Sequence, residues 1–412
     1  MNPVRHHNNV SDGAKHNMSN GVKLLFISGD TSLAQGKKGP FYYLLEEFSK
    51  YWDQVDIICP RADRRGSKRG FTQKFFNNVF IHSSPWPLIF QLWFIFKKGA
   101  EIYNEQKFDI FGIHSYPPFY NDIGGLKLHK KIKVPYVLEV MHINGYPKAS
   151  GFKERVYKIL TRLFIKFFAK MALAIRVINQ KQVPDFLINS GVNKNKIKYT
   201  PAFYIDFNIF KPLNLEKKYD IVFSGRLVKN KGINLLLEAI KLIKESQPTA
   251  GHPQGENVKL IIIGEGPMKK KIQEFIRKNN LQNNIELVGW LPSINDVARI
   301  YNQSKLMVMP SFNEGGPRVT LEAMACKTPV ITTKVGIMSD IIEDPSTSSG
   351  QANGLFINWD VKDIKNKIML LLNNDDLRNK IAENGYQLVQ QFERKKIIEN
   401  YARTYQTLLH HS

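Results

Sequence analysis

The sequence has very little cysteine, with only Cys59 and Cys326 among its 412 residues. Two thiols are too few for a disulfide framework, and they lie too far apart in the sequence for a thiolate metal motif. Long apolar runs are missing too, because the longest, at 86–96, is about half the ~20 residues that a spanning helix needs. Residues 1–21 are polar, without the apolar segment of a secretory signal, and are predicted to form a disordered tail. We therefore expect a cytoplasmic protein without a transmembrane anchor.

Acidic residues are also scarce, with 36 against 59 basic residues and a net charge of +23. Such an excess favours an anionic partner, which in principle includes nucleic acid, acidic lipid and phosphorylated substrates. A basic nucleic-acid-binding protein is thus one hypothesis. The chain has neither zinc-finger spacing nor the aromatic motif of ribonucleoprotein domains, and its basic residues are dispersed. Nucleic acid is therefore not the partner we expect.

Short apolar segments alternate with longer amphipathic ones from residue 22 onward, and the same alternation restarts at residue 219. This pattern is typical of βαβ units that build a parallel sheet. We expect an α/β protein with two Rossmann-like domains that face each other across a cleft. The predicted domains are 22–210 and 218–389, followed by a helix at 390–412 that crosses back to the first domain.

The first informative loop of the second domain is SGRLVKNKG, where a predicted strand ends at Gly225. Ligands of open parallel sheets bind beyond the carboxyl ends of the strands. Arg226 and Lys231 in this loop are suited to a diphosphate, because Arg binds oxygens bidentately and Lys adds a mobile charge. The alternative is a basic loop exposed to solvent.

The next two loops are less specific. Gly264 in GEGP permits a close approach of the backbone to a ligand, but it is equally typical of a tight turn. Trp290 and Leu291 in VGWLP could hold a nucleobase, and packing of Trp290 in the core is the alternative.

The fourth loop, PSFNEGGPRVTLEAMACKTPVI, carries the strongest pattern. Pro317 is suited to the first turn of the helix that follows, whose N-terminus offers free N–H groups and a positive dipole end to a phosphate. A second carboxylate, Glu322, follows Glu314 by eight positions. A diphosphate would repel both carboxylates, so they are predicted to bind hydroxyl groups of ribose and sugar. The alternative for Glu322 is an acidic residue that interacts only with the helix dipole.

In order along 219–343, these motifs resemble glycosyltransferase family 4, a large group of retaining enzymes with the GT-B fold. The resemblance implies a sugar transfer from a nucleotide-sugar donor, UDP- or GDP-linked, with no other cofactor. Arg226 and Lys231 would stabilise the leaving diphosphate, and Glu322 would hold the ribose. Glu314 and the amides from Gly315 and Gly316 through Pro317 to Arg318 would contact the donor sugar.

The first domain resembles the family less closely. Gly39 lies where family members have a glycine loop that touches the diphosphate, but Pro40 replaces the second glycine and removes an amide donor. After a predicted strand, His142 matches the histidine that many members place near the sugar. An ordinary histidine at the end of a strand is the alternative.

The resemblance also implies a mechanism, in which the acceptor hydroxyl attacks from the face that the leaving diphosphate occupies. Negative charge would build up on the β-phosphate, where cations and helix amides stabilise it. No D-x-D motif occurs, so no metal is expected. A nucleotide-sugar epimerase or a phosphorylase of the same fold stays open as an alternative.

The acceptor is predicted to be a glycan or a lipid-linked sugar, in cell-surface polysaccharide or glycolipid synthesis. In the segment 155–175, five basic residues recur every three or four positions, with apolar residues elsewhere around the helix. Such a helix is suited to peripheral binding of an anionic membrane surface, here the inner face. A domain helix with a solvated basic face is the alternative.

Overall fold

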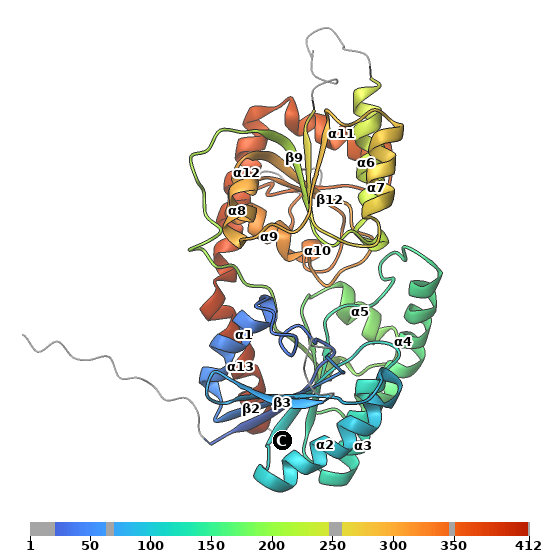
Figure 1. The fold of residues 1–412 in the computed structure, drawn as a ribbon, viewed down its shortest axis with the longest axis vertical. Coiled ribbons are helices and arrows are strands. Elements are labelled where there is room, and N and C mark those ends of the chain that lie inside the picture. The colour runs from blue at the N-terminus through green and yellow to red at the C-terminus, as the bar shows by residue number, and fades with distance from the viewer. Residues whose placement is uncertain (1–20, 63–69, 247–257, 346–350, 411–412) are drawn as a thin grey trace, which may run out of the picture.

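A computed structural model describes residues 21–62, 70–246, 258–345 and 351–410. The predicted N-terminal tail lies, apart from Gly21, outside these ranges. The described residues form two α/β domains, one above the other in Figure 1. The expected α/β architecture with two parallel-sheet domains is confirmed.

The first domain contains a sheet of the order β3-β4-β2-β1-β5-β6-β7-β8. Its neighbouring strands are parallel except β3, which pairs antiparallel with β4 at the edge. The central strands are buried and apolar, as expected for a sheet covered on both faces. The strands are β1 (Lys23–Ile27), β2 (Gln54–Cys59), β3 (Phe71–Phe75), β4 (Val79–Ser83), β5 (Ile110–His114), β6 (Tyr136–Val140), β7 (Ala174–Val177) and β8 (Ile197–Tyr199).

In the described part of this domain, five α-helices connect the strands, and a short 3₁₀ turn, η2 (Leu88–Phe90), leads into the second of them. Pro40 begins the first helix, where its missing N–H removes no helical hydrogen bond. The helices are α1 (Pro40–Phe48), α2 (Gln91–Gln106), α3 (Tyr120–Ile132), α4 (Phe152–Met171) and α5 (Gln182–Ile188).

The second domain contains a parallel sheet of the order β11-β10-β9-β12-β13-β14. The strands are β9 (Tyr219–Ser224), β10 (Leu260–Ile263), β11 (Ile285–Val288), β12 (Ser304–Met309), β13 (Val330–Thr332) and β14 (Leu355–Phe356). The helices are α6 (Ile233–Lys244), α7 (Lys269–Lys278), α8 (Ile294–Asn302), α9 (Arg318–Ala325), α10 (Met338–Ile341), α11 (Val361–Leu372) and α12 (Asp375–Val389).

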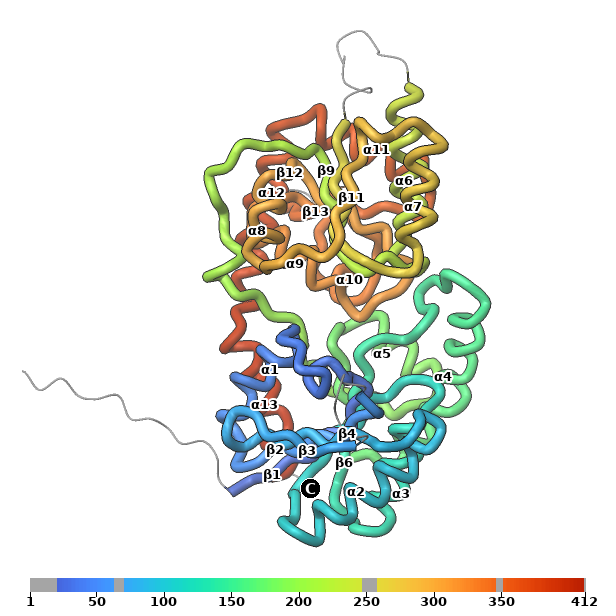
Figure 2. Tube along the Cα trace, viewed as in Figure 1, coloured from blue at the N-terminus to red at the C-terminus, as the bar shows by residue number. Residues whose placement is uncertain are grey.

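Two segments pass between the domains on the same side, the linker after β8 and the chain that leads into α13 (Arg394–His410). Figure 2 shows both segments along this side. They are hydrogen-bonded to each other, since Ile205 N–H donates to the Phe392 carbonyl at 2.7 Å and Arg394 N–H donates to the Ile205 carbonyl at 3.1 Å. Helix α13 then packs beside α1 on the first domain.

A buried polar cluster helps to hold α13 in place. The hydroxyls of Tyr401 and Tyr405 donate to Glu139 Oε1 at 2.9 Å and 2.6 Å, and Arg176 pairs with the other oxygen of the same carboxylate. All four side chains are buried, so the charges of Glu139 and Arg176 depend on each other and on these hydroxyls.

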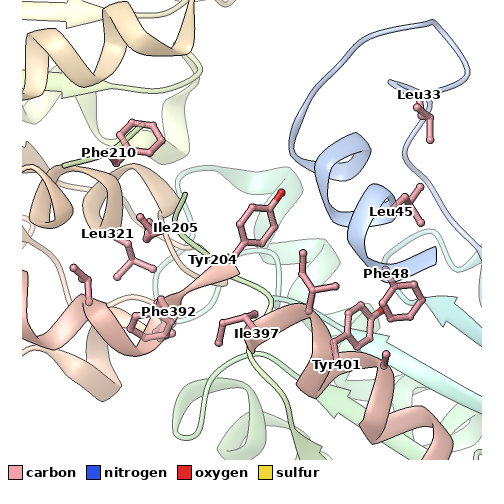
Figure 3. Packing of buried hydrophobic residues seen from close by; sticks show 14 of the residues in the cluster. Leu33, Leu45, Phe48, Tyr204, Ile205, Phe210, Leu321, Phe392, Ile397 and Tyr401 are labelled. Atoms are coloured by element: carbon pink, nitrogen blue, oxygen red, sulfur yellow. The ribbon is translucent and has the colours of Figure 1, made fainter. Parts of the chain in front are cut away.

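One apolar cluster continues from the first domain to the second through these segments. Figure 3 shows Leu45 and Tyr401 at one end of it and Leu321 and Phe392 at the other. Shared burial of this kind stabilises one arrangement of the two domains, because separating them would expose the cluster to water. No helix in the described ranges combines the length and apolar content needed to cross a bilayer.

Candidate active site

The loops that follow β10, β9 and β12 lie next to one another at the carboxyl edge of the second sheet, and their backbones are in close contact. A Cβ atom on Gly264 would lie 2.0 Å from the carbonyl oxygen of Gly225, and one on Gly232 would lie 1.9 Å from that of Pro310. Each of these three glycines also has a positive φ. Larger residues would therefore force apart the loops that carry Arg226, Lys231 and Glu314.

Arg226 and Lys231, the two cations predicted to bind a diphosphate at this edge, differ in their surroundings. Arg226 is exposed, and its guanidinium has no ion pair or hydrogen bond with any described residue. Lys231 is not independent: its Nζ lies 2.6 Å from Oε2 of Glu314. The other carboxylate oxygen of Glu314 accepts a hydrogen bond from Ser311. Two residues with separate predicted roles thus form one fixed ion pair.

The start of α9 presents backbone donors on the same edge. The structure makes Pro317 the N-cap, and α9 begins at Arg318, so the prediction of Pro317 within the first turn is off by one position. Within the described ranges, no acceptor is found for the N–H groups of Gly315, Gly316 and Arg318. These amides and the helix dipole can bind an anion.

Glu322 lies inside the second domain, on α9, and is only 9% exposed. Its Oε2 accepts a weak hydrogen bond, 3.4 Å long, from the hydroxyl of the buried Tyr301. Burial raises the pKa of Glu322 to about 7, although Arg318 and the Tyr301 hydrogen bond lower it. The alternative role, an interaction with the helix dipole alone, is less favoured because the first turn of α9 contains no acidic residue and the dipole acts mainly within that turn. Nothing in the sequence identified Tyr301 as its partner.

Trp290 and Leu291 follow β11, so they lie at the carboxyl edge of the second sheet. Trp290 is 59% exposed, so it is not part of the core. Leu291 is half-buried and packs against the shared apolar cluster. An exposed indole beside a half-buried leucine suits a flat aromatic ligand, and the binding of a nucleobase here stays a prediction.

The first domain places His142, which follows β6, near this edge. His142 is solvent-exposed, yet the protein on either side displaces enough water to lower its pKa, an effect that Glu314 opposes and Lys231 reinforces. The domains touch here, since a Cβ atom on Gly315 would lie 2.4 Å from the Met141 carbonyl oxygen. The structure thus brings His142, Glu314 and Lys231 together from two domains.

Gly39, the other predicted residue of the first domain, is the N-cap of α1. Added atoms at Gly39 would meet nothing within 4 Å, so the space beside it is open. The neighbouring Pro40 carbonyl accepts a hydrogen bond of 2.8 Å from Tyr204, whose ring lies 4.4 Å from the Arg318 guanidinium carbon. The starts of α1 and α9 are thus linked through a single linker residue.

Further contacts between the domains were not predicted. Asn313 Nδ2 donates to the Lys148 carbonyl at 3.0 Å and to Glu154 Oε2 at 2.9 Å. On the other side of Gly315, Gly336 N–H donates to Gln182 Oε1 at 2.8 Å. These contacts lie on the loops that flank Glu314, so they fix its position relative to His142. They join residues more than 150 positions apart, which local sequence patterns cannot reveal.

The described residues contain no group of three or more His, Cys, Asp or Glu side chains placed to hold a metal ion. The positive side chains and amides of this edge can bind a phosphate, whereas the carboxylates can accept hydrogen bonds from hydroxyl groups. The arrangement fits a ligand with an anionic centre and hydroxylated groups on either side of it.

Comparison with known sequences identifies the family. The family described as Glycosyl transferases group 1 matches residues 205–388. The chain is 30% identical over 349 residues to an uncharacterized glycosyltransferase of Methanocaldococcus jannaschii, covering 82% of this chain and 88% of that protein. It is 31% identical over 283 residues to the capsular polysaccharide biosynthesis glycosyltransferase CapM of Staphylococcus aureus, covering 64% of this chain and 68% of CapM.

Comparison with solved structures supports the fold. A sucrose-phosphate synthase of Thermosynechococcus elongatus superposes with a TM-score of 0.77 at 18% identity, over 95% of this chain and all of that one. HepE of Anabaena, solved with UDP and glucose, gives a TM-score of 0.68 at 17% identity, over 94% of this chain and all of HepE. At such low identity the likeness concerns the fold alone, which is GT-B, as expected. The protein therefore belongs to the group 1 glycosyltransferases.

Proposed function

We propose that this enzyme transfers a sugar from a UDP- or GDP-linked donor to a hydroxyl of a glycan or lipid-linked acceptor, with retention of the anomeric configuration. One observation carries the proposal: Arg226, Lys231 and the free amides at the start of α9 lie at one sheet edge, with Glu322 on the same helix. Such an edge can bind a diphosphate and a ribose at the same time.

The roles follow from charge and position. Arg226 and the amides of Gly315, Gly316 and Arg318 stabilise the charge that develops on the leaving diphosphate. Lys231 contributes from its ion pair with Glu314, and Glu322 accepts hydrogen bonds from the ribose hydroxyls. Glu314 and His142 face the donor sugar from opposite domains. Gly39 and the start of α1 approach the diphosphate from the first domain, and Trp290 with Leu291 borders the base.

The acceptor class is proposed from relatives and from the surface of the first domain. CapM is named for capsular polysaccharide synthesis, and a Campylobacter jejuni relative, 24% identical over 304 residues, is named for transfer to a diphospho-undecaprenol acceptor. We therefore propose a role in cell-surface polysaccharide or glycolipid synthesis, and a cytoplasmic location belongs to the same proposal.

Peripheral binding to an anionic membrane belongs to the same proposal. Its support comes from helix α4, whose exposed side carries apolar as well as basic residues, whereas Leu160 is half-buried and Phe168 buried. Apolar and basic side chains on one exposed side match an anionic bilayer surface. The exposed apolar residues of α4 are Phe152, Ile159, Leu163, Phe164, Phe167 and Met171, and its exposed basic residues are Lys153, Arg155, Arg162, Lys166 and Lys170.

A donor panel tests the proposal. Ligand binding raises the melting temperature by mass action, so a UDP-, GDP- or ADP-linked sugar that binds is identified by its thermal shift. The donor is then incubated with the protein and candidate acceptors, and the product anomer is read by nuclear magnetic resonance. Retention supports the proposal, and inversion contradicts it. A free epimer formed without acceptor, or a strict requirement for inorganic phosphate, indicates the epimerase or the phosphorylase instead.

A further inference from the structure

A cavity of about 460 Å³ lies on the first domain. It is lined by Gly29, Pro60, Arg61, Pro87, Leu88 and Tyr116. Gly29 follows β1, Pro60 and Arg61 follow β2, and Tyr116 follows β5, so the cavity occupies the carboxyl edge of three adjacent parallel strands. Ligands of open α/β sheets bind at this edge.

The position of the cavity relates it to the proposed reaction. Strand β5, which leads to Tyr116, pairs with β6, which leads to His142. The ring of His114, at the end of β5, lies 6.5 Å from that of Phe41 in the first turn of α1. The cavity thus lies one strand away from His142, which the proposed function places at the donor sugar. It is on the first domain, whereas Arg226 and the α9 amides, proposed to bind the diphosphate, are on the second.

The walls near Tyr116 are held in a defined shape. A Cβ atom on Gly29 would lie 1.9 Å from the Tyr116 hydroxyl, so the tyrosine packs directly on the loop after β1. Asn121 donates to the His114 carbonyl at 3.1 Å and to the Tyr116 hydroxyl at 3.4 Å, which fixes the loop after β5. Such walls can orient a ligand without rearrangement.

An apolar surface borders one side of the cavity. Leu88, which lines the cavity, is followed by Ile89, Phe90 and Trp93, and all four side chains are at least half exposed. Large apolar side chains gathered at a surface commonly mark a site that binds an apolar partner. We call residues 88–93 the apolar rim.

The charges near the rim are suited to a phosphate. Among the described residues that line the cavity, Arg61 is charged and none is acidic. The Lys127 ammonium lies 4.2 Å from the centre of the Trp93 ring, so positive charge also lies against the rim. A ligand that fits has an anionic head in the cavity and a hydrocarbon tail across the rim.

We propose that this cavity and rim bind the acceptor, and that the acceptor is an amphiphile whose sugar is joined to a hydrocarbon tail through a phosphate or diphosphate. This inference rests on the proposed function, and it narrows the acceptor from a glycan or a lipid-linked sugar to a sugar linked to a lipid through phosphate. Arg61 binds the phosphate, the rim covers the tail, and the sugar extends from the cavity toward His142.

Binding of farnesyl diphosphate, measured by calorimetry below its micelle concentration, tests the inference. Saturating UDP or GDP, whichever binds, first fills the donor site, so that the diphosphate of the probe cannot bind there. We expect farnesyl diphosphate to bind, and inorganic pyrophosphate and farnesol each to bind at least 10-fold more weakly. Equal affinity for pyrophosphate would show that the rim holds no tail, and equal affinity for farnesol would show that Arg61 holds no phosphate. Either result, or no binding of farnesyl diphosphate, overturns the inference.

Surface variants locate the site. Leu88→Asn and Arg61→Gln should each weaken the binding of farnesyl diphosphate by about 10-fold or more. Leu370→Asn is the matched control, since Leu370 is an exposed leucine on α11 of the second domain and should have no effect. Unchanged affinity in both Leu88→Asn and Arg61→Gln, at unchanged melting temperature, overturns the assignment.

The same protein separates the two proposals. Titration with UDP and GDP alone, without lipid, measures the donor site. If neither nucleotide binds, the proposed function itself fails. If a nucleotide binds and farnesyl diphosphate does not, only the inference about the acceptor fails.

Discussion

Lys231 Nζ lies 2.6 Å from Glu314 Oε2, and both side chains are largely buried, with 15% and 11% of their surfaces exposed. The pair joins the loop after β9 to the loop after β12. In the proposed function the donor diphosphate shares Lys231 with Glu314, since both are anionic. The ion pair therefore holds the lysine in position before the donor binds and competes with the donor for its charge.

Glu314→Gln tests this competition. Removing the carboxylate charge frees Lys231 for phosphate and removes a repulsion, so the affinity for UDP or GDP should rise by about threefold or more. Turnover should fall, because the charged contact to the donor sugar is lost. Calorimetry of nucleotide binding and a transfer assay measure the two effects.

Glu265→Gln is the control, because Glu265 forms an ion pair of the same length, 2.6 Å, with Lys269 on the adjacent loop. It should change neither property. Weaker nucleotide binding by Glu314→Gln would contradict the account of the pair.

Glu322 should make donor binding depend on pH. Burial raises its pKa from the ordinary 4.5 to about 7. The ionised carboxylate accepts hydrogen bonds from the ribose hydroxyls more strongly than the protonated acid does, so the donor KM should rise as the pH falls below about 7. In Glu322→Gln the donor KM should be higher and should not vary over this range. A wild-type donor KM that stays constant from pH 5.5 to 8.5 would be inconsistent with the assigned role.

The raised pKa of Glu322 also makes the stability of the fold depend on pH. Stability should fall as the pH rises, whereas donor binding should improve. The pKa of Glu322 is higher in the folded protein than in the unfolded chain. Its contribution to the stability of the folded state is therefore fully present below the pKa of the unfolded chain, and it is lost as the pH rises through about 7. Glu322→Gln should thus raise the melting temperature relative to wild type at pH 8 more than at pH 5. Thermal unfolding at the two pH values measures the difference.

Gly315→Ala tests the contact between the domains. Its added Cβ would lie 2.4 Å from the Met141 carbonyl oxygen and 2.8 Å from Ile178 Cδ1, so the domains must move apart. We expect turnover to fall by about 10-fold or more, since a displacement of 1 Å in a site is costly. Gly151→Ala is the control, because a Cβ there meets nothing within 4 Å and Gly151 has an extended φ. Wild-type turnover in Gly315→Ala would mean that the contact does not position the site.

Tyr405→Phe tests how α13 is held on the first domain. The variant removes a hydrogen bond of 2.6 Å to the buried Glu139, which should destabilise the protein by about 1.5–3 kcal/mol. Tyr103→Phe should have little effect, because the Tyr103 hydroxyl makes no hydrogen bond with a described residue. Denaturant unfolding followed by fluorescence compares the two. Equal loss of stability in both variants would contradict the assigned role of Tyr405.

The sequence predicted the two sheets because buried parallel strands such as β1 and β10 are continuous apolar runs between amphipathic helices. It also predicted which loops carry charge, since Arg226 lies in the loop after β9 and Glu314 in the loop after β12. It did not predict that Lys231 pairs with Glu314, that Tyr301 contacts Glu322 or that Asn313 contacts Glu154. These contacts join distant segments, and their distances depend on the packing of whole domains. The cavity at Arg61 was missed for the same reason, as its lining comes from four separate loops.

The central claim is that Arg226 and its neighbours bind the donor diphosphate, and Arg226→Ala tests it most directly. Lys229→Ala is the matched control, since Lys229 is an exposed cation of the same loop. With the donor identified by thermal shift, kcat/KM should fall by about 10²-fold or more in Arg226→Ala and stay within about twofold of wild type in Lys229→Ala. A value of kcat/KM near that of wild type in a folded Arg226→Ala would contradict the claim.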